Sequence, residues 1–100
     1  ATRYYGSMIR SFKGKRSKRV FSRSPERGMT VEVQRASYRK MAILDAAGAL
    51  SDLRIPPGNR LEKLAGDRAG QYSIRINDQW RICFVWRRGD AYDVEIVDYH

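Results

Sequence analysis

The stretch "YSIRINDQWRICFVW", Tyr72 to Trp86, decides the fold. Its first five residues alternate apolar and polar side chains, and a second, mostly apolar run occupies residues 80–86. Between the two runs, Asn77-Asp78-Gln79 supplies residues that are typical of turns. Alternation with a period of two places successive side chains on opposite faces of a strand. The stretch therefore predicts a β-hairpin.

The strand pattern continues toward the C-terminus. Residues 87–90, Arg-Arg-Gly-Asp, form a second turn, and residues 92–99 form a third apolar-rich run. We therefore predict a three-stranded antiparallel meander. The face of its middle strand that should receive a helix consists of even-numbered residues, which are Trp80, Ile82, Phe84 and Trp86. Arg81 then points to the opposite, helix-free face.

A helical pattern precedes the meander. From Val31 to about Leu53, apolar residues recur at steps of three or four, which predicts a helix of roughly twenty residues. Thr30 is a suitable N-cap, because its hydroxyl can accept a hydrogen bond from a free backbone N–H. Residues 56–58, Pro-Pro-Gly, prevent the helix from continuing.

The N-terminal third is short of apolar residues. Residues 8–12, Met-Ile-Arg-Ser-Phe, predict a short first strand, and residues 13–30 predict at most a short helix around residues 15–22. We interpret residues 1–7, which end in Gly-Ser before a Met, as an expression tag. Residues 8–100 are then long enough for one core but not two, so we expect a single α+β domain.

The charge of the chain favours a polyanionic partner. There are 20 Lys and Arg against 11 Asp and Glu, which gives a formal net charge of +9. Arginine, whose planar guanidinium binds phosphate in two places and stacks on bases, dominates these cations. Nucleic acid is therefore the leading partner class, while a solvated surface without a partner stays open as the alternative.

The residue counts and motifs exclude several other classes of protein. One cysteine cannot form an internal disulfide, and no apolar run has the length of a membrane span or signal peptide, so we expect a reduced, soluble, cytoplasmic protein without a membrane partner. One Cys and one His are too few for a zinc site, and neither glycine-rich nucleotide motif occurs, so we predict no metal and no cofactor. Cys83, between Ile82 and Phe84, is better explained as a small buried hydrophobe than as a nucleophile.

The remaining chemistry lies in Arg81 and in the terminal residues Asp98, Tyr99 and His100. Neighbouring strands of a meander would bring them together. Phosphodiester cleavage requires a group that accepts a proton, a group that donates one and a fixed positive charge for the phosphorane. Two simpler readings stay open, because Arg81 can be a salt-bridge partner and the terminal residues can be a frayed end.

Three segments resemble a known family. These are "RLEKLAGDRAGQYSIRINDQWRICFVW" at residues 60–86, "GDAYDVEIVDYH" at residues 89–100 and "MIRSFKGK" at residues 8–15. They are similar to the HigB toxins of bacterial toxin–antitoxin pairs, within the RelE/ParE superfamily, and closest to the GraT branch. The resemblance implies a RelE-like fold, in which an N-terminal strand and two helices pack on one face of a mainly antiparallel sheet.

The resemblance also implies an activity and partners. HigB toxins are endoribonucleases that cut messenger RNA codons in the ribosomal A site. Each is neutralised by a HigA-type antitoxin with a helix-turn-helix, through which the complex binds operator DNA. Transferred by motif, the likeness places Arg81, Asp98, Tyr99 and His100 in the active site.

The match departs from the family in the segment before Gly66. Glu62 stands where some HigB toxins have His, and Ala65 stands where they have Lys. Glu62 can still act as a base, and Lys63 or Arg60 can supply charge. The residues that we expect to contact RNA are Arg60, Lys63, Arg75, Lys13, Lys15 and Arg16.

The predicted reaction needs no metal: the RNA 2′-hydroxyl attacks the adjacent phosphate and leaves a cyclic phosphate and a free 5′-hydroxyl. Arg81 would stabilise the transition state, His100 or Asp98 would handle one proton, and Tyr99 would orient the base or backbone. Two alternatives remain. The chain can be a basic RNA-binding protein without catalysis, or a gyrase inhibitor of the ParE type.

Overall fold

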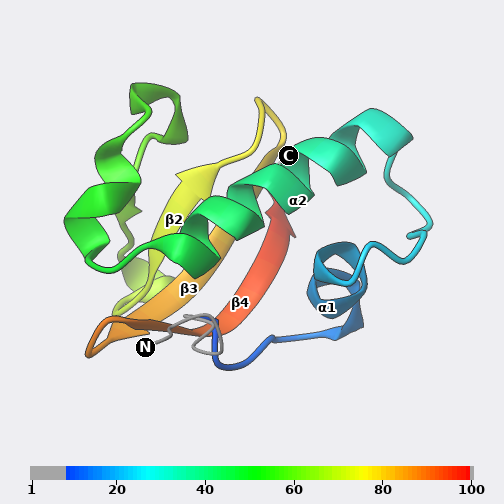
Figure 1. The fold of residues 1–100 in the computed structure, drawn as a ribbon. Helices are drawn as coiled ribbons and strands as arrows, with labels where there is room; N and C mark the ends of the chain where they lie inside the picture. Colours follow the sequence, from blue (N-terminus) through cyan, green and yellow to red (C-terminus); the bar gives the residue numbers. More distant parts are fainter. Residues whose placement is uncertain (1–8, 100) are drawn as a thin grey trace.

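The protein folds as two helices on a four-stranded antiparallel sheet, which confirms the predicted α+β fold and its meander (Figure 1). The computed structural model describes residues 9–99, so the predictions for residues 1–8 and for His100 lie outside the described residues. The sheet has the order β1-β2-β3-β4. Its strands are β1 (Glu62–Lys63), β2 (Tyr72–Arg75), β3 (Trp80–Arg87) and β4 (Asp90–Asp98). Within residues 9–99, no helix has the length and apolarity to cross a bilayer.

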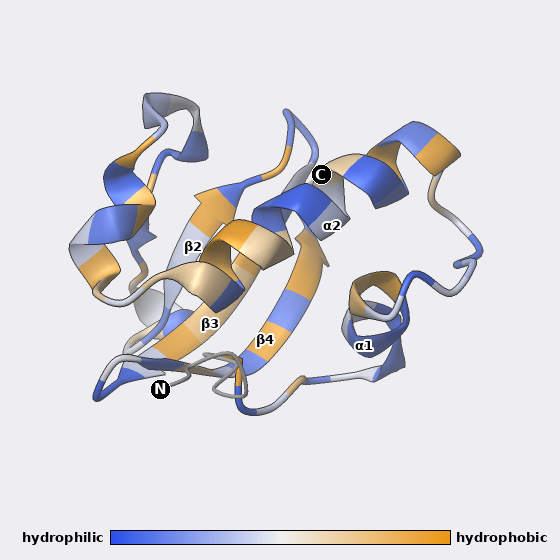
Figure 2. Cartoon of the chain, in the orientation of Figure 1, coloured by the Kyte–Doolittle hydropathy of each residue, from blue (hydrophilic) through white to orange (hydrophobic). Residues whose placement is uncertain are grey.

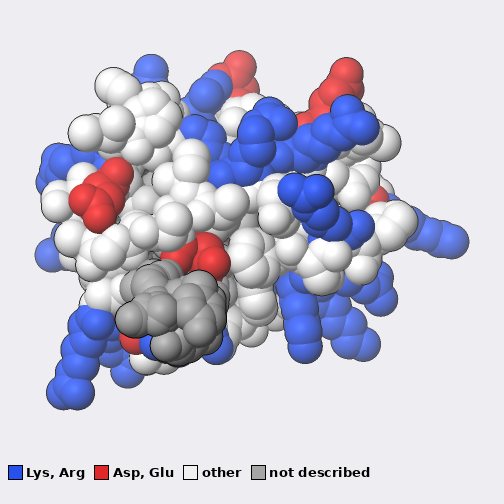
Figure 3. Space-filling model, in the orientation of Figure 1, with Lys and Arg blue, Asp and Glu red and all other residues white. Residues whose placement is uncertain are grey.

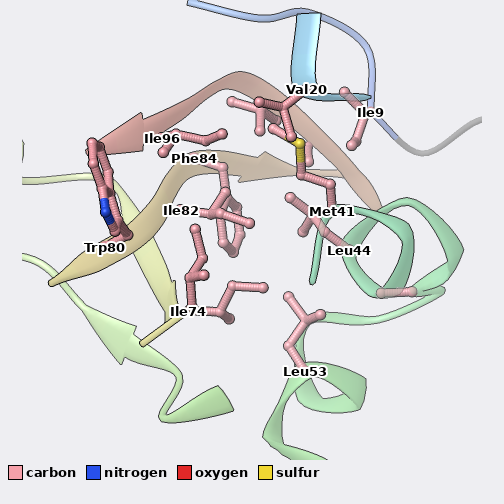
Figure 4. Close-up of a cluster of buried hydrophobic side chains, with 14 of the residues drawn as sticks. Ile9, Val20, Met41, Leu44, Leu53, Ile74, Trp80, Ile82, Phe84 and Ile96 are labelled. Atoms are coloured by element: carbon pink, nitrogen blue, oxygen red, sulfur yellow. The ribbon is translucent and has the colours of Figure 1, made fainter. Parts of the chain in front are cut away.

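The core lies between the sheet and the two helices, α1 (Lys15–Phe21) and α2 (Val31–Ala46). Figure 2 shows apolar residues along the strands that lie behind α2, and Figure 4 shows the side chains that meet in the core. Met41 of α2 is fully buried, as are Ile82 and Phe84 of β3. The predicted core face of β3 is therefore confirmed, with Trp86 half-buried at its edge.

Helix α2 begins as predicted and ends earlier. The Thr30 hydroxyl accepts a hydrogen bond from the Val33 N–H at 3.1 Å, which confirms the N-cap. The prediction that the helix runs to about Leu53 is wrong, because it ends at Ala46 and residues 50–54 form a separate 3-10 helix, η2 (Leu50–Arg54). The carboxylate of Asp52 accepts hydrogen bonds from the N–H groups of Gly48 and Ala49, both at 3.0 Å. A side chain thus takes the donors that a longer helix would have used.

The N-terminal residues run beside β4. Helix α1 matches the short helix expected there. The expected first strand is reduced to two isolated parallel bridges, from Ile9 to Ala91 and from Phe12 to Val94. One reason is that the Ile9 N–H donates to the Asp45 carboxylate at 3.0 Å instead of to a strand.

Strand β4 contains a β-bulge at Asp93. Cys83 of β3 pairs with Glu95, whereas Val85 pairs with Tyr92, so β4 carries one extra residue between these pairs. Asp93 has a φ of 52°, and its N–H donates to the Ser11 hydroxyl at 2.8 Å. The bulge lets Ala91, before it, and Val94, after it, both face the core.

Candidate active site

The face of the sheet opposite the core carries a polar cluster. Residues paired across antiparallel strands share a face, and Arg81 pairs with Arg75 of β2 and with Val97 of β4. Tyr99 lies two residues beyond Val97. A hollow of about 360 Å³ opens on this face, lined by Arg60, Glu62, Arg75, Asn77, Asp78, Arg81 and Tyr99.

Arg81 is the fixed cation of the hollow. Its side chain is only 10% exposed. Its Nε donates to the Ser73 hydroxyl at 2.8 Å, and its Nη2 donates to the Arg60 carbonyl at 2.7 Å and lies 3.3 Å from the Glu62 carboxylate. Its Nη1 has no hydrogen-bond partner among residues 9–99. Since a buried charge is costly unless it is paired, these contacts hold the guanidinium in one orientation and leave one end for a ligand.

The Arg60 carbonyl is held in place by the loop that precedes β1. Arg60 has a φ of 46° and follows the short 3-10 helix η3 (Pro57–Asn59). Asn59 is fully buried, and its amide donates to the carbonyls of Leu53 at 3.2 Å and Ile55 at 3.3 Å. Its amide oxygen accepts a hydrogen bond from the Lys40 ammonium. Burial and the nearby charge of Arg75 lower the pKa of Lys40. Asn59 thus joins α2 to the turn that positions Arg81.

Tyr99 lies over Arg81. The Arg81 guanidinium carbon is 5.7 Å from the centre of the Tyr99 ring, and the Tyr99 N–H donates to the Gln79 carbonyl at 2.7 Å. Burial raises the pKa of Tyr99, so its phenol is neutral near pH 7. The phenol oxygen is 3.9 Å from the sulfur of Cys83, which is fully buried as predicted. Burial raises the pKa of the Cys83 thiol as well, so it stays protonated.

The structure brings together only some of the predicted site residues. Arg60, Glu62 and Arg75 line the hollow with Arg81 and Tyr99. Asp98, Lys63, Lys13, Lys15 and Arg16 lie outside the hollow, and His100 is outside the described residues.

Asp98 pairs with Trp80 and therefore faces the core side of the sheet, where its carboxylate accepts from the Gln79 amide at 3.1 Å. Arg16 also lies on that side, with its guanidinium carbon 5.2 Å from the centre of the Trp80 ring. Exposed Lys13 and Lys15 belong to the same N-terminal segment, at the start of α1. Lys63 follows Glu62 in β1 and points to the other face of that strand.

The family model for the RelE-like toxin of the type II toxin–antitoxin system HigB matches residues 10–100. The chain belongs to the HigB-like toxin family.

Two relatives of this HigB-like chain illustrate the likeness. It is 56% identical over 59 residues to Toxin HigB-1 of Vibrio cholerae serotype O1, a match that covers 59% of this chain and 62%, less than two thirds, of that protein. It is 38% identical over 94 residues to Endoribonuclease HigB of Proteus vulgaris, which covers 93% of this chain and all of the relative. Membership of this family implies an antitoxin partner.

The hollow of this HigB-like toxin has the groups that phosphate chemistry uses. Arg60, Arg75 and Arg81 outnumber its two acids, Glu62 and Asp78, and Asp78 is paired with Arg75. A phosphate can therefore bind beside Arg81, and a fixed cation there stabilises negative charge that develops on its oxygens. The side chain of Glu62 is 57% exposed, so its carboxylate can reach a proton on a bound ligand.

Sequence reasoning missed Ser73, Asn59 and Lys40, the residues that support the site. Ser73 has one signal, since a small polar residue stands in an apolar strand at a position that faces Arg81. Asn59 and Lys40 have none, because they act through the loop that precedes β1.

Proposed function

We propose that this chain is the toxin of a type II toxin–antitoxin pair and an endoribonuclease that cleaves messenger RNA codons in the ribosomal A site. The observation that carries the proposal is Arg81, a buried guanidinium fixed by Ser73, Arg60 and Glu62 at the floor of a cationic hollow. The name Endoribonuclease HigB, borne by the Proteus vulgaris relative, supports the same reaction class.

The proposed step is an internal transfer that needs no metal. The ribose 2′-oxygen attacks phosphorus while a base takes its proton, and the bond from phosphorus to the 5′-oxygen breaks as an acid protonates that oxygen. The products are a 2′,3′-cyclic phosphate and a 5′-hydroxyl. Arg81 neutralises the charge of the five-coordinate phosphorus. The exposed carboxylate of Glu62, 3.3 Å from Arg81, is placed to serve as the base.

The terminal residues complete the proposed site. Tyr99 orients the RNA base or backbone, because its ring already lies 5.7 Å from the Arg81 guanidinium carbon. His100 or Asp98 handles the second proton. Asp98 pairs with Trp80 on the core side of the sheet, so its carboxylate would have to reach the hollow around the end of the strand.

The remaining cations serve RNA binding in this proposal. Arg60 and Arg75 contact the phosphates next to the cleaved bond, and Lys63, Lys13, Lys15 and Arg16, which lie outside the hollow, contact backbone farther away. Since few groups act on the substrate, the ribosome must impose its geometry. The toxin should then bind free RNA in a salt-sensitive manner and cut it slowly. Rapid cleavage of naked RNA would contradict this part of the proposal.

The proposed partners follow from the same assignment. They are a HigA-type antitoxin, whose helix-turn-helix places the complex on operator DNA, and the ribosome with its messenger RNA in the cytoplasm. Within the family we assign the chain to the GraT branch, on the motifs in residues 60–86 and 89–100.

The test compares Arg81→Ala with Arg88→Ala, an exposed arginine in the turn at the far end of β3. Induced in cells, Arg81→Ala should no longer arrest growth, because losing a preorganised charge costs roughly 10²–10³ in rate. Arg88→Ala should arrest growth like the wild type. Primer extension on a transcript should show codon-phased cuts for the wild type and the control only.

Other outcomes would redirect the assignment. Growth arrest without cuts would favour a gyrase target, and absence of toxicity in the wild type would favour RNA binding alone. If a folded Arg81→Ala variant cleaves at the wild-type rate, Arg81 does not stabilise the transition state.

A further inference from the structure

A second hollow lies between α1 and the first half of α2, far from Arg81. It has a volume of about 430 Å³ and is lined by Val20, Arg23, Ser24, Val31, Gln34, Arg35, Tyr38 and Arg39. We call these residues the α1–α2 groove. Because both helices pack on the core side of the sheet, the groove and the Arg81 hollow lie on opposite sides of the molecule.

The apolar part of the groove is not explained by folding. Val31 is the first residue of α2, and it is 61% exposed. The first turn of a helix favours an acidic or polar side chain, whereas valine is disfavoured in water at that exposure. Beside it, Tyr38 is only partly buried, against Phe21 of α1. Val31 and Tyr38 therefore offer a small apolar surface, rimmed by the polar residues of the groove, on which an apolar side chain of a partner can pack.

The charged part of the groove points to the same conclusion. Arg23, Arg35 and Arg39 are exposed, and none of the three forms an ion pair with another residue of the described chain. Arg35 and Arg39 are four residues apart on α2, where like charges disfavour the helix. The Arg23 guanidinium carbon lies 4.1 Å from the centre of the Tyr38 ring. Figure 3 shows Lys and Arg side chains gathered over this part of α2.

We propose that the α1–α2 groove binds an acidic segment of the antitoxin, with an apolar side chain of the segment against Val31 and Tyr38. Carboxylates on either side of that apolar side chain would pair with Arg23, Arg35 and Arg39. The partner is a peptide rather than RNA, since the exposed valine gains from burial against an aliphatic or aromatic side chain and gains nothing from a phosphate. The inference rests on the toxin–antitoxin assignment of the family and does not depend on the nuclease step.

The experiment measures the affinity of the full-length antitoxin encoded with this toxin for three toxin variants by calorimetry. Val31→Glu replaces the apolar contact and places an acid where the helix terminus favours one, so the fold should be retained. Arg35→Glu with Arg39→Glu reverses the charge of the groove. Arg54→Glu with Arg88→Glu is the matched control, because it reverses two exposed arginines outside the groove.

Each groove variant should weaken antitoxin binding by about 10–100-fold, as expected for central interface residues, and the control should bind like the wild type. The affinity of the wild type should fall as salt is raised. Cleavage by the free toxin should be unchanged in the groove variants. If the nuclease assignment fails but the groove variants still lose the antitoxin, the docking inference stands alone.

Two results would overturn the proposal that the α1–α2 groove binds the antitoxin. One is wild-type antitoxin affinity in both groove variants while they melt like the wild type. The other is retention of antitoxin binding with loss of ribosome or RNA binding, which would make the groove a nucleic-acid surface.

Discussion

Replacing Ser73 by alanine tests whether the geometry of Arg81, and not only its charge, is needed. The Ser73 hydroxyl is fully buried and accepts the Arg81 Nε–H at 2.8 Å. Without it, a buried donor on a charged group loses its partner, which costs about 1–3 kcal/mol of unfolding free energy. For a domain of this size, each kcal/mol lowers the melting temperature by about 4–8 °C.

The chain supplies a matched control at Ser37 of α2. Ser37 is also fully buried, but its hydroxyl has no hydrogen-bond partner among the described residues. Ser37→Ala therefore removes an unpaired polar group and gains helix propensity, so the free energy of unfolding should stay level or rise. The same substitution at the same burial should thus lower the free energy of unfolding at Ser73 and not at Ser37.

The activity assay separates stability from positioning. At a temperature where both variants are folded, Ser73→Ala should slow codon-phased cleavage by up to about 100-fold, because a displaced catalytic group loses its alignment with the phosphate. Ser37→Ala should cleave at the wild-type rate. If Ser73→Ala is as stable as Ser37→Ala and cleaves as fast as the wild type, then the serine does not hold Arg81 and the reasoning fails.

Three further predictions concern the groups around Arg81. Glu62→Gln should slow cleavage by about 10²-fold or more if Glu62 is the base, with little change in melting because the Glu62 side chain is 57% exposed and Arg81 keeps its hydrogen bonds to Ser73 and the Arg60 carbonyl; faster cleavage would instead mean that Glu62 competes with phosphate for Arg81. Removal of Tyr99 and His100 should preserve folding, since the core residues of β3 and β4 remain, and should reduce cleavage by about 10²–10⁴-fold, which melting and primer extension on one preparation would check. Burial raises the pKa of Tyr99 above 10.0, so near that pH the folded protein keeps a phenol proton that the unfolded chain loses. The protonated phenol therefore favours the folded state, and this stability is lost as pH rises through the folded pKa. Melting curves between about pH 9 and about pH 11 should fall more steeply for the wild type than for Tyr99→Phe, and equal slopes would contradict the shift.

The sheet could be predicted because its signal is local. The alternation in residues 72–76, the turn residues 77–79 and the apolar run in residues 80–86 predict both strands of the hairpin, and Thr30 marks the start of α2 by a hydrogen bond within one turn. The end of α2 could not be predicted in this way. The apolar spacing continues through Ala47 and Leu50, and the helix ends because the Asp52 side chain takes backbone donors that the pattern does not describe.

The sequence predicted that Arg81 and Tyr99 belong to the site, but it did not predict the residues that position them. Arg81 and Tyr99 meet because the register of the meander brings them together, as expected from their positions in neighbouring strands. The contact from Arg81 to the Arg60 carbonyl spans 21 residues, and it depends on a buried asparagine whose partners lie in two other elements. No periodic pattern of apolar and polar residues predicts such a contact. The placement of Asp98 on the other face depends on the bulge at Asp93, which the sequence pattern did not reveal.

That bulge makes the length of β4 as important as its composition. Before Asp93 the odd-numbered residues of β4 face the core, and after it the even-numbered ones do. The last residues of a chain usually tolerate insertions and deletions. Here, loss of a single residue between Val94 and Asp98 would exchange the two sides of the strand end, so that Asp98 faced the Arg81 hollow and Tyr99 faced Trp80. Ser11, whose hydroxyl holds the bulge roughly 20 Å along the strand from Tyr99, therefore helps to decide which of the terminal side chains meets the substrate.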